Sequence, residues 1–269
     1  IFPDRFSRDG NAIIEKRGAV FHASWQDDPC YYKDPDTKEI VAYDFFGGNL
    51  KGIEKKLDYL KGLGISVIYL NPVFESESNH HYDTGDYHKI DPILGSNEDF
   101  RHLVDVAKAK GIRIIIDGVF SHTGSNSRYF NREGQYDTIG AFQSPDSPYF
   151  EWYNFRNFPY EYESWWNFST LPDVKETTPS YMDFIIYDKD SVLHHWMKEG
   201  IAGWRLDVID ELPAAFSQSF FAELKKTDPD AVMIGEVWED ASHKVAYGVP
   251  REYLCGQEMD SAMNYPFRQ

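Results

Sequence analysis

The sequence is poor in cysteine and contains no long apolar run. Cys30 and Cys255 are its two cysteines, and their separation matches no disulfide framework, metal site or redox motif, so we predict two free thiols. No run of about 18 or more apolar residues occurs, so the sequence offers no candidate for a membrane-spanning helix. It also contains no internal repeat and no low-complexity tract. What remains is a chain of ordinary globular composition, long enough for one large domain.

Basic side chains are scarce relative to acidic ones. The chain has 27 Lys and Arg against 44 Asp and Glu, which gives a formal net charge of -17 at pH 7. An acidic field repels phosphate groups, which argues against nucleic acid and acidic membranes as partners and favours a neutral ligand. Aromatic residues are plentiful at 16%, including 7 Trp and 18 Tyr. We expect most of them in the core, but an excess in loops suits stacking on sugar rings.

Short apolar segments alternate with helical patterns along the chain. We predict strands at residues 65–70, 112–116, 203–208 and 232–238, helices at about 49–63, 96–110 and 213–225, and a further unit starting near 263–267. Ser96 and Asp99 have the spacing of a capping box at the start of the second helix. Such alternation of strand and helix indicates parallel βαβ units.

Polar residues gather where each predicted strand ends. They are Asn71, Asp117, His122, Arg205, Asp207 and Glu236. An α/β barrel places its active site at this end of the strands. An open doubly wound sheet does so as well, but no glycine-rich phosphate loop follows any strand here. We therefore predict an α/β barrel.

Residues 123–187 interrupt this rhythm. The segment is rich in Asn, Ser, Pro, Gly and aromatic residues and has weak periodicity. A loop of that length is normally either disordered or a small inserted subdomain. Its density of Trp and Tyr favours an ordered insertion, which would divide the barrel into residues 1–122 and 188–269.

Two carboxylates carry the predicted chemistry. Arg205 and Asp207 lie two apart on a strand and so face the same way. An adjacent Arg lowers the pKa of a carboxyl group, which keeps it ionised as a glycosyl nucleophile must be. Glu236 ends the next strand near Trp238, and partly apolar surroundings would raise its pKa and keep it protonated as a general acid. The alternatives are a structural ion pair for Asp207 and a solvated strand end for Glu236.

Other side chains in these regions are candidates for contacts with a sugar. His122, in the loop after Asp117, carries an imidazole that can donate to a hydroxyl group, although a lone loop histidine is more often simply exposed. Tyr82 offers a stacking platform, and His80 and His81 are further donors. The two adjacent histidines lack a third ligand, which argues against a metal there.

In sequence order, these segments resemble the signature regions of the α-amylase family of glycoside hydrolases. The resemblance rests on residues 117–122, 203–211 and 236–238, and residues 171–174 (Leu-Pro-Asp-Val) are similar to an additional signature of the family. Within the family the chain looks most like the branch of neopullulanases, cyclomaltodextrinases and amylopullulanases, on residues 1–6, 44–48, 79–87 and 235–240.

The resemblance implies a (β/α)8 TIM barrel of which this chain holds about strands two to six, with residues 123–187 as the inserted B domain after the third strand. It implies Asp207 as nucleophile and Glu236 as general acid/base of a retaining hydrolase. The substrates implied are starch-type glucans with α-1,4-glucosidic bonds, namely maltodextrin, cyclodextrin or pullulan. The residues implied to surround the sugar are Arg205, His122, Tyr82, His80 and Asp117, with Trp238 and Glu211 toward the leaving group.

The chain departs from the family pattern in two respects. No His-Asp pair supplying a third carboxylate follows Glu236, and strands seven and eight are missing, so the resemblance implies a truncated barrel or a piece of a longer enzyme. Ser121 stands where the family usually has an Asn that helps to bind calcium. A different structural calcium site is a candidate near the start of the barrel, with hard oxygen ligands from Asp9, Asn11, Gly47 and Asn49.

The implied reaction needs no cofactor for its chemistry. The alternatives are an inactive fragment or a glucan-binding homologue without the third carboxylate, and a transferase of the same family. Many members of this branch form homodimers through an additional N-terminal domain that this chain does not include. The preferred glucan and the compartment do not follow from the sequence.

Overall fold

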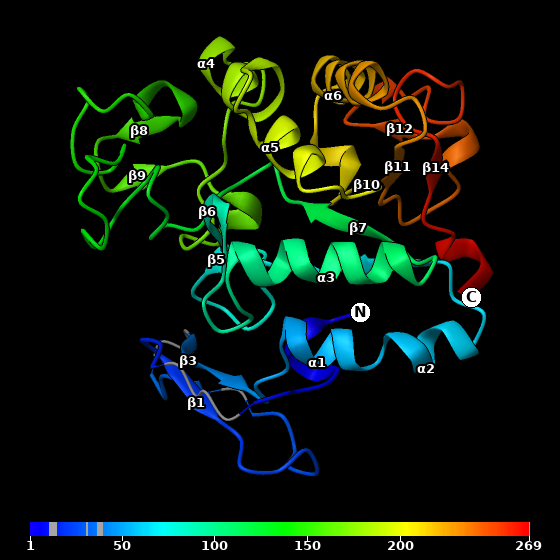
Figure 1. The fold of residues 1–269 in the computed structure, drawn as a ribbon. Coiled ribbons are helices and arrows are strands. Elements are labelled where there is room, and N and C mark those ends of the chain that lie inside the picture. Colours follow the sequence, from blue (N-terminus) through cyan, green and yellow to red (C-terminus); the bar gives the residue numbers. More distant parts are fainter. Residues whose placement is uncertain (11–14, 31, 37–39, 269) are drawn as a thin grey trace.

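The computed structural model describes residues 1–10, 15–30, 32–36 and 40–268 (Figure 1). A five-stranded sheet lies at its centre, and every neighbouring pair in the order β14, β11, β10, β7, β4 is parallel. The strands are β4 (Val67–Leu70), β7 (Arg113–Gly118), β10 (Gly203–Leu206), β11 (Val232–Gly235) and β14 (Ser261–Ala262). The four predicted strands are therefore present in one parallel sheet, and the unit expected near residue 263 begins with the fifth.

Helices connect these strands. They are α1 (Leu50–Lys55) and α2 (Leu57–Gly62) before β4, α3 (Asn97–Ala109) before β7, α5 (Val192–Lys198) before β10, and α6 (Ala214–Thr227) before β11. The predicted capping box of α3 is confirmed, because Ser96 Oγ accepts from the Asp99 amide and the Asp99 carboxylate accepts from the Ser96 amide. The helical stretch predicted at about 49–63 is present as two helices. The backbone tightens at Lys56, whose amide bonds to the carbonyl of Ile53, and the turn separates α1 from α2.

Alternate side chains of the strands face opposite sides of the sheet. On one side Trp204 is fully buried and packs against Phe220 of α6, with 5.7 Å between the ring centroids. On the other side Arg205 lies over the ring of Tyr69 from β4, 5.7 Å from its centroid. Helices thus cover one face of the sheet. The side chains that point to the other face include the polar groups that meet near the carboxyl ends of the strands.

Smaller sheets flank these strand ends. They are an N-terminal sheet of β1 (Ala19–Phe21), β3 (Ile40–Phe45) and β2 (Tyr32–Lys33), a pair β5 (Phe74–Ser76) with β6 (Thr84–Ile90), and a pair β12 (Val245–Ala246) with β13 (Val249–Pro250). Figure 1 shows β1, β3, β5 and β6 on the side of the molecule toward which β7 points. The sequence analysis did not predict these strands, because most of them are only two or three residues long and the two longer ones, β3 and β6, lack a regular alternation of apolar and polar residues.

The segment 123–187 is ordered and aromatic. It contains β8 (Phe155–Asn157) paired with β9 (Glu161–Tyr162), the short helix α4 (Pro179–Met182) and a π-helical turn (Asp183–Tyr187). Trp152 is buried between Tyr129 and Tyr181, at centroid distances of 5.4 and 5.0 Å. The 3-10 turns along the chain are Pro3–Arg5, Phe150–Trp152, Trp165–Asn167, Ile209–Glu211, Ala241–His243 and Tyr265–Arg268.

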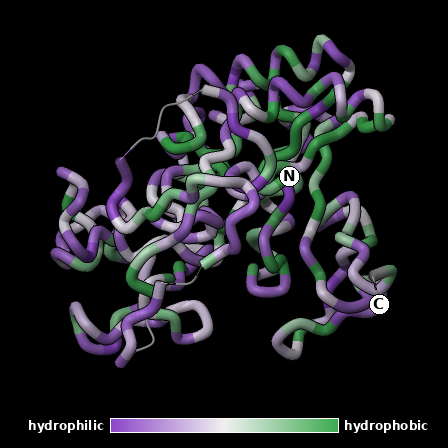
Figure 2. The backbone as a smooth tube through the Cα atoms, turned by 90° about the horizontal axis from the view of Figure 1, so that it is seen from below, coloured by the Kyte–Doolittle hydropathy of each residue, from purple (hydrophilic) through white to green (hydrophobic). Residues whose placement is uncertain are grey.

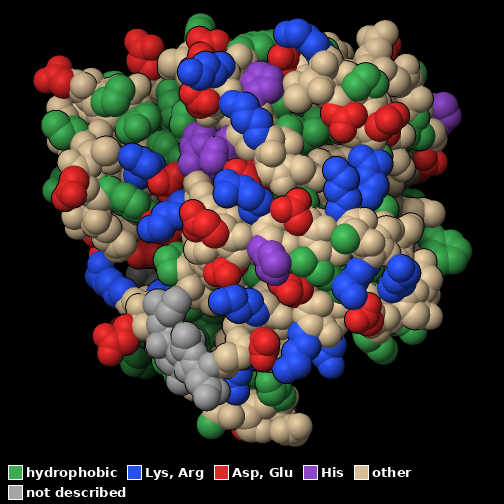
Figure 3. Space-filling model, viewed as in Figure 1, with side chains coloured by type: hydrophobic (Ala, Val, Ile, Leu, Met, Phe, Trp, Pro, Cys, Tyr) green, Lys and Arg blue, Asp and Glu red, His purple; other side chains and the backbone are tan. Residues whose placement is uncertain are grey.

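Hydrophobic and hydrophilic stretches alternate along the whole backbone and do not form separate blocks (Figure 2). Across the ranges that the structure describes, no helix combines the length and the apolar character needed to cross a bilayer. Basic and acidic side chains are interspersed on the face seen in Figure 3, so the excess of acidic charge forms no single patch on that face. Cys30 and Cys255 are both free and exposed, as predicted.

Gly203 begins β10 where its backbone lies directly against β11. A Cβ atom there would lie 1.9 Å from the carbonyl oxygen of Val232, and the φ angle of 148° is one that other residues rarely adopt. We expect Gly203→Ala to lower the free energy of unfolding by about 2–5 kcal/mol, measured by urea denaturation. Gly62→Ala is the matched control, because nothing lies within 4 Å of its Cβ in α2. That variant should be neutral or stabilise by up to about 1 kcal/mol, and equal losses in both variants would contradict the close approach of β10 to β11.

Candidate active site

Arg205 occupies the centre of the polar group at the strand ends. Its partner in the register of β7 is Asp117, and Nη1 of Arg205 donates to the two carboxylate oxygens of Asp117 at 2.8 and 2.9 Å. The same nitrogen donates to Oδ1 of Asp207 at 2.7 Å, and Nη2 lies 2.7 Å from Oε2 of Glu236. All four side chains are buried. One guanidinium therefore holds three carboxylates from the ends of adjacent strands.

The backbone bends sharply between the two predicted catalytic residues. Val208, directly after Asp207, has φ 33° and ψ 64°, a left-handed conformation that β-branched residues rarely adopt. Its amide donates to Oε2 of Glu236 at 3.0 Å, while the Glu236 amide donates to the carbonyl of Leu206 at 3.0 Å. The hydroxyl of Tyr265 donates to Oε1 of Glu236 at 2.7 Å. The bend thus fixes Asp207 and Glu236 relative to each other through the main chain.

Two phenols hold Asp117 from the other side. The hydroxyl of Tyr69 donates to Oδ2 of Asp117, and the hydroxyl of Tyr82 donates to the same oxygen at 3.1 Å. The side-chain amide of Asn71 donates to the Tyr82 hydroxyl at 3.1 Å. The predicted sugar-stacking residue Tyr82 is therefore linked through Asp117 to Arg205.

His122 and His80 both contact the backbone of Tyr82. Nε2 of His122 lies 3.0 Å from the Tyr82 carbonyl oxygen, and the Tyr82 amide donates to Nδ1 of His80 at 3.1 Å. Nδ1 of His80 is thus an acceptor, which leaves Nε2 as the donor of a neutral ring. Burial lowers the pKa of His122 to about 4 and also lowers the pKa of His80. Both rings are therefore neutral hydrogen-bonding groups at pH 7.

A cavity of about 440 Å³ opens over these side chains. Its lining includes the predicted residues Asp207, Glu236, His122, His80, Tyr82 and Trp238, together with Tyr43, Trp165 and Phe168. Arg205 and Asp117 are not among the lining residues and instead support them through the bonds described above. The structure thus brings eight of the nine predicted site residues into one connected group.

Glu211 lies outside this cavity. Its Oε1 accepts from the indole N–H of Trp166 at 3.4 Å, and the ring of Trp166 meets the ring of Trp238 edge-on at 5.9 Å. Trp238 itself is 40% exposed, which places it at the rim. The Glu211 side chain is thus joined to the rim of the cavity through Trp166 and Trp238, and its amide donates to the carbonyl of the cavity-lining Val208 at 2.8 Å.

The pKa shifts of the two predicted catalytic groups run opposite to the sequence-based prediction. The pKa of Asp207 is raised to about 8 by burial and by the negative charge of Asp117, which outweigh the attraction of Arg205. Burial also acts to raise the pKa of Glu236, but the charge of Arg205 and the hydrogen bond from Tyr265 bring it below its ordinary value. The prediction was wrong because it paired Arg205 with Asp207 alone. One positive charge cannot balance three buried negative charges, so the group retains a proton near neutral pH.

Residues 171–174 of the insertion pair with the loop that follows β7. His122 and Asp173 form an isolated antiparallel bridge, and the Val174 amide donates to the carbonyl of Ser121 at 3.0 Å. The pKa of Asp173 is raised to about 7 by burial and by the charge of Glu211 nearby. This motif therefore lies against the cavity-lining His122, with its own carboxyl group partly protonated at neutral pH.

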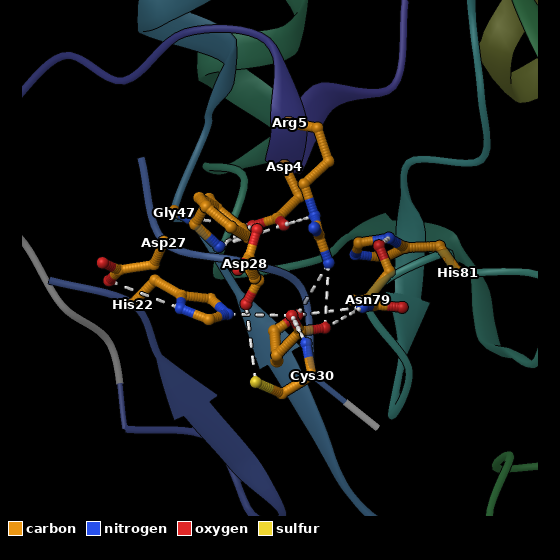
Figure 4. Close-up of polar contacts among 11 residues, drawn as sticks. Asp4, Arg5, His22, Asp27, Asp28, Cys30, Gly47, Asn79 and His81 are labelled. Carbon is orange, nitrogen blue, oxygen red and sulfur yellow. Dashed lines mark hydrogen bonds and ion pairs between the residues drawn. The ribbon is translucent and has the colours of Figure 1, made fainter. Parts of the chain in front are cut away.

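The buried carboxylate of Asp44 is the centre of a polar network that holds the loop carrying His80 and Tyr82. Figure 4 shows its partners Arg5, His22, Cys30 and Asn79. Oδ1 of Asp44 accepts from Arg5 Nη2 at 2.9 Å and from Asn79 Nδ2 at 3.0 Å. Oδ2 accepts from the Cys30 amide at 2.9 Å and lies 2.8 Å from Nε2 of His22. Asp44 belongs to β3, so the network ties the N-terminal sheet to the loop that begins at Asn79.

The candidate calcium ligands lie apart from this cavity and have other partners. The carboxylate of Asp9 lies 3.1 Å from Nζ of Lys55. Oδ1 of Asn49 caps α1 by accepting from the Gly52 amide at 2.8 Å. Asn11 lies outside the described residues. A cation at Asp9 would compete with the exposed Lys55 ammonium, and the calcium site stays a prediction. Among the residues that the structure describes, no group of three His, Cys, Asp or Glu side chains is arranged to hold a metal.

Several side chains of the site were not predicted from the sequence. Tyr69 had a usable signal, because it lies two positions before Asn71 on a strand and so shares its face. Tyr265 comes from a turn, Tyr43 from β3, whose residues do not alternate between apolar and polar, and Phe168 from the insertion, so periodicity gives no indication of their direction.

The sequence and the structure of this chain are both similar to those of known proteins. The family described as alpha amylase, catalytic domain, matches residues 1–269. The amylopullulanase of Thermoanaerobacterium saccharolyticum is 43% identical over 298 residues, covering 100% of this chain and 22% of that protein. Neopullulanase 2 of Thermoactinomyces vulgaris is 35% identical over 276 residues, covering 100% of this chain and 42% of that protein. The crystal structure of Ttha1563 from Thermus thermophilus has a TM-score of 0.81 and 38% identity, covering 99% of this chain and 51% of that one.

The match thus extends over the whole chain, while the chain spans between 22% and 51% of the length of these relatives. The parallel βαβ sheet, with its polar residues at the strand ends, agrees with the fold of that family. The chain belongs to the alpha-amylase family and corresponds to part of its TIM-barrel catalytic domain.

Proposed function

We propose that this chain carries the catalytic centre of a retaining hydrolase of α-1,4-glucans, with Asp207 as nucleophile and Glu236 as general acid/base. The observation that carries the proposal is the binding of both carboxylates, each at 2.7 Å, to one guanidinium beside an aromatic-walled cavity. Retaining glycosidases need two carboxyl groups about 5–5.5 Å apart, and two carboxylates on one guanidinium suit such a separation.

We also propose how the chain fits the family's barrel. In this assignment β4, β7, β10, β11 and β14 are strands two to six of an incomplete (β/α)8 barrel. Residues 1–122 and 188–269 belong to the barrel, and residues 123–187 form the B domain inserted after the third strand, β7. The position of the polar residues after successive strands supports this order.

The first chemical step forms a bond between the anomeric carbon and an oxygen of Asp207. The glycosidic bond breaks, its electron pair stays on the departing oxygen, and that oxygen takes the proton of Glu236. The pKa of Asp207 is raised to about 8, so Asp207 holds a proton near neutral pH, and that proton must pass to Glu236 before Asp207 attacks as a carboxylate. Arg205, which contacts both groups, balances the charge as the proton changes place.

The second step releases the sugar. Glu236, now ionised, takes a proton from water, whose oxygen attacks the anomeric carbon and displaces the Asp207 carboxylate. An acceptor sugar in place of water would give transglycosylation. Tyr82, His80 and His122 surround the sugar as hydrogen-bonding and stacking groups, while Trp238 and, farther out, Glu211 contact the leaving part. The chemistry needs no cofactor.

The substrate class follows from the wall of the cavity and from the relatives. Aromatic rings and neutral histidines suit an uncharged sugar, and the names amylopullulanase and neopullulanase point to pullulan and starch-type glucans. Homodimer formation and a structural calcium ion remain predictions that sedimentation and calcium titration would test. A glucan-binding protein without activity would bind maltohexaose and release no product from it.

Replacement of the two carboxyl groups separates their roles. We expect Asp207→Asn to lower kcat by at least about 10⁴-fold on both maltohexaose and α-maltosyl fluoride, because neither substrate reacts without the nucleophile. Glu236→Gln should lower kcat by about 10²–10⁴-fold on maltohexaose but much less for fluoride release, because fluoride leaves without a proton. Initial rates on both substrates measure this difference. Asp230→Asn, at an exposed position, is the control, and full activity of Asp207→Asn would contradict the assignment.

The shared proton predicts the pH dependence of the reaction. The raised pKa of Asp207 means that the group holds its proton up to about pH 8, so kcat/KM should fall above that pH as the general acid is lost. Asp117→Asn removes one of the negative charges that raise this pKa, so the alkaline limb should move to lower pH. Asp230→Asn should leave the limb in place. A limb that moves to higher pH in Asp117→Asn would contradict the charge arrangement.

A further inference from the structure

The hydroxyl of Tyr69 is directed at Asp117, one of the three carboxylates around Arg205. Tyr69 lies on β4 and pairs in register with Ile115 of β7, and Asp117 lies two residues further along the same face of β7. Neither Tyr69 nor Asp117 is among the described residues that line the catalytic cavity. Any influence of Tyr69 on a bound sugar must therefore pass through Asp117 and the guanidinium of Arg205.

The buried carboxylate of Asp117 is surrounded by hydrogen-bond donors. Nη1 of Arg205 donates to both of its oxygens, at 2.8 and 2.9 Å, and the hydroxyl of Tyr82 donates to Oδ2 at 3.1 Å. Tyr69 adds a fourth contact, also at Oδ2. The Tyr82 oxygen accepts from the side-chain amide of Asn71, so the hydrogen of Tyr82 stays directed at Asp117. These four contacts compensate the charge of Asp117 in place of water.

A proton on Asp117 would break this pattern. A neutral carboxyl group must donate its own hydrogen, and a guanidinium has no atom that can accept it. Burial raises the pKa of Asp117 above its ordinary value, although the charge of Arg205 and the hydroxyls of Tyr69 and Tyr82 act to lower it. Without the Tyr69 hydroxyl, Oδ2 would lose one of its two phenol donors and would be free to hold a proton. The ionised state of Asp117 therefore depends on Tyr69.

The location of the proton in this group matters for the proposed reaction. Asp207 and Glu236 line the cavity and both contact Arg205 at 2.7 Å, whereas a proton held on Asp117 lies behind the cavity wall and cannot reach the departing oxygen. Such a proton would leave Glu236 without the hydrogen that it must donate. Across the described ranges, the charged or titratable groups in contact with the three carboxyls are Tyr69 of β4, Tyr82 of the loop after β5, Arg205 of β10 and Tyr265 of the last turn.

We propose that Tyr69 is a positioning residue of the catalytic centre, which keeps Asp117 ionised and thereby leaves the proton of the group to Asp207 and Glu236. This inference rests on the proposed function. The Tyr69 hydroxyl touches neither the sugar nor the reacting atoms and acts through the charge of Asp117. Loss of the hydroxyl lets Asp117 take the proton, and the site then holds Asp207 and Glu236 both as carboxylates.

The pH dependence of Tyr69→Phe in the natural full-length protein tests this. The variant keeps the ring and loses only the hydroxyl. A proton drawn to Asp117 is held more tightly by the group but is unavailable to Glu236. We therefore expect kcat/KM on maltohexaose to fall about tenfold on its neutral plateau and its alkaline limb to move up by about one pH unit. Above the limb the curves of variant and wild type should meet, because the population with the proton on Glu236 then depends on the affinity of Glu236 alone.

α-Maltosyl fluoride separates this effect from a general loss of structure. Fluoride leaves without a proton, but its release requires Asp207 as a carboxylate. Since a proton on Asp117 leaves Asp207 ionised, fluoride release by Tyr69→Phe at neutral pH should equal or exceed that of the wild type. Equal losses on both substrates at every pH would show a merely structural role and would overturn the inference, as would an unchanged pH profile.

Two further variants sharpen the test. Tyr253→Phe removes another buried phenol that donates to a carboxylate, Oδ1 of Asp210 at 2.6 Å, and should leave the plateau and the limb in place. In Asp117→Asn the unproductive site for the proton is gone, so the addition of Tyr69→Phe should shift neither quantity further. A shift as large as in the wild-type background would overturn the inference and leave the hydrolase proposal intact. Failure of the wild type to cleave either substrate would overturn the hydrolase proposal, and this inference with it.

Discussion

The balance of charge around Arg205 governs the rest of the site. Its guanidinium is buried among the carboxylates of Asp117, Asp207 and Glu236, and removal of the cation would leave those charges without compensation in a medium that penalises them strongly. The register of β10 against β7 places Arg205 beside Asp117, and the strained turn at Val208 brings Glu236 into the same group. The excess of buried acid over base raises the pKa of Asp207 to about 8. The architecture and the chemistry therefore depend on the same ion pairs.

Much of the central sheet could be predicted from the sequence, because its strands are buried on both faces and read as apolar runs followed by polar residues. The strands predicted at residues 112–116 and 203–208 agree with the structure to within two residues. The N-terminal sheet and the β5–β6 pair could not be predicted, since β1, β2 and β5 are too short to show a period and β3 and β6 lack a regular alternation of apolar and polar residues. The helix is interrupted at Lys56 because one turn of the backbone is tighter there. The spacing of apolar residues along α1 and α2 does not indicate this interruption.

The site residues were identifiable for a different reason. Arg205 and Asp207 share a face by strand geometry, and the family resemblance named the others, of which Glu211 lies outside the cavity. The direction of the pKa shifts could not be predicted, because it depends on how many carboxylates share the Arg205 guanidinium. That number is fixed by the register of three strands, and the Tyr265 hydroxyl, which comes from a distant turn, lowers the pKa of Glu236 further. Tyr43 and Phe168 likewise reach the cavity only through the packing of the N-terminal sheet and the insertion.

The central claim is that Asp207 forms a covalent bond to the sugar, while Glu236 donates a proton to the leaving oxygen and later takes one from water. The most direct measurement uses Glu236→Gln with α-maltosyl fluoride, since fluoride departs without the acid and the later hydrolysis lacks its base. Intact-mass and peptide mass spectrometry would then locate the attached sugar. The account predicts one maltosyl group on the peptide that contains Asp207, released when azide is added as an external nucleophile. A sugar attached to Asp117 or to another residue, or steady fluoride release with no attached sugar and inverted product, would contradict it.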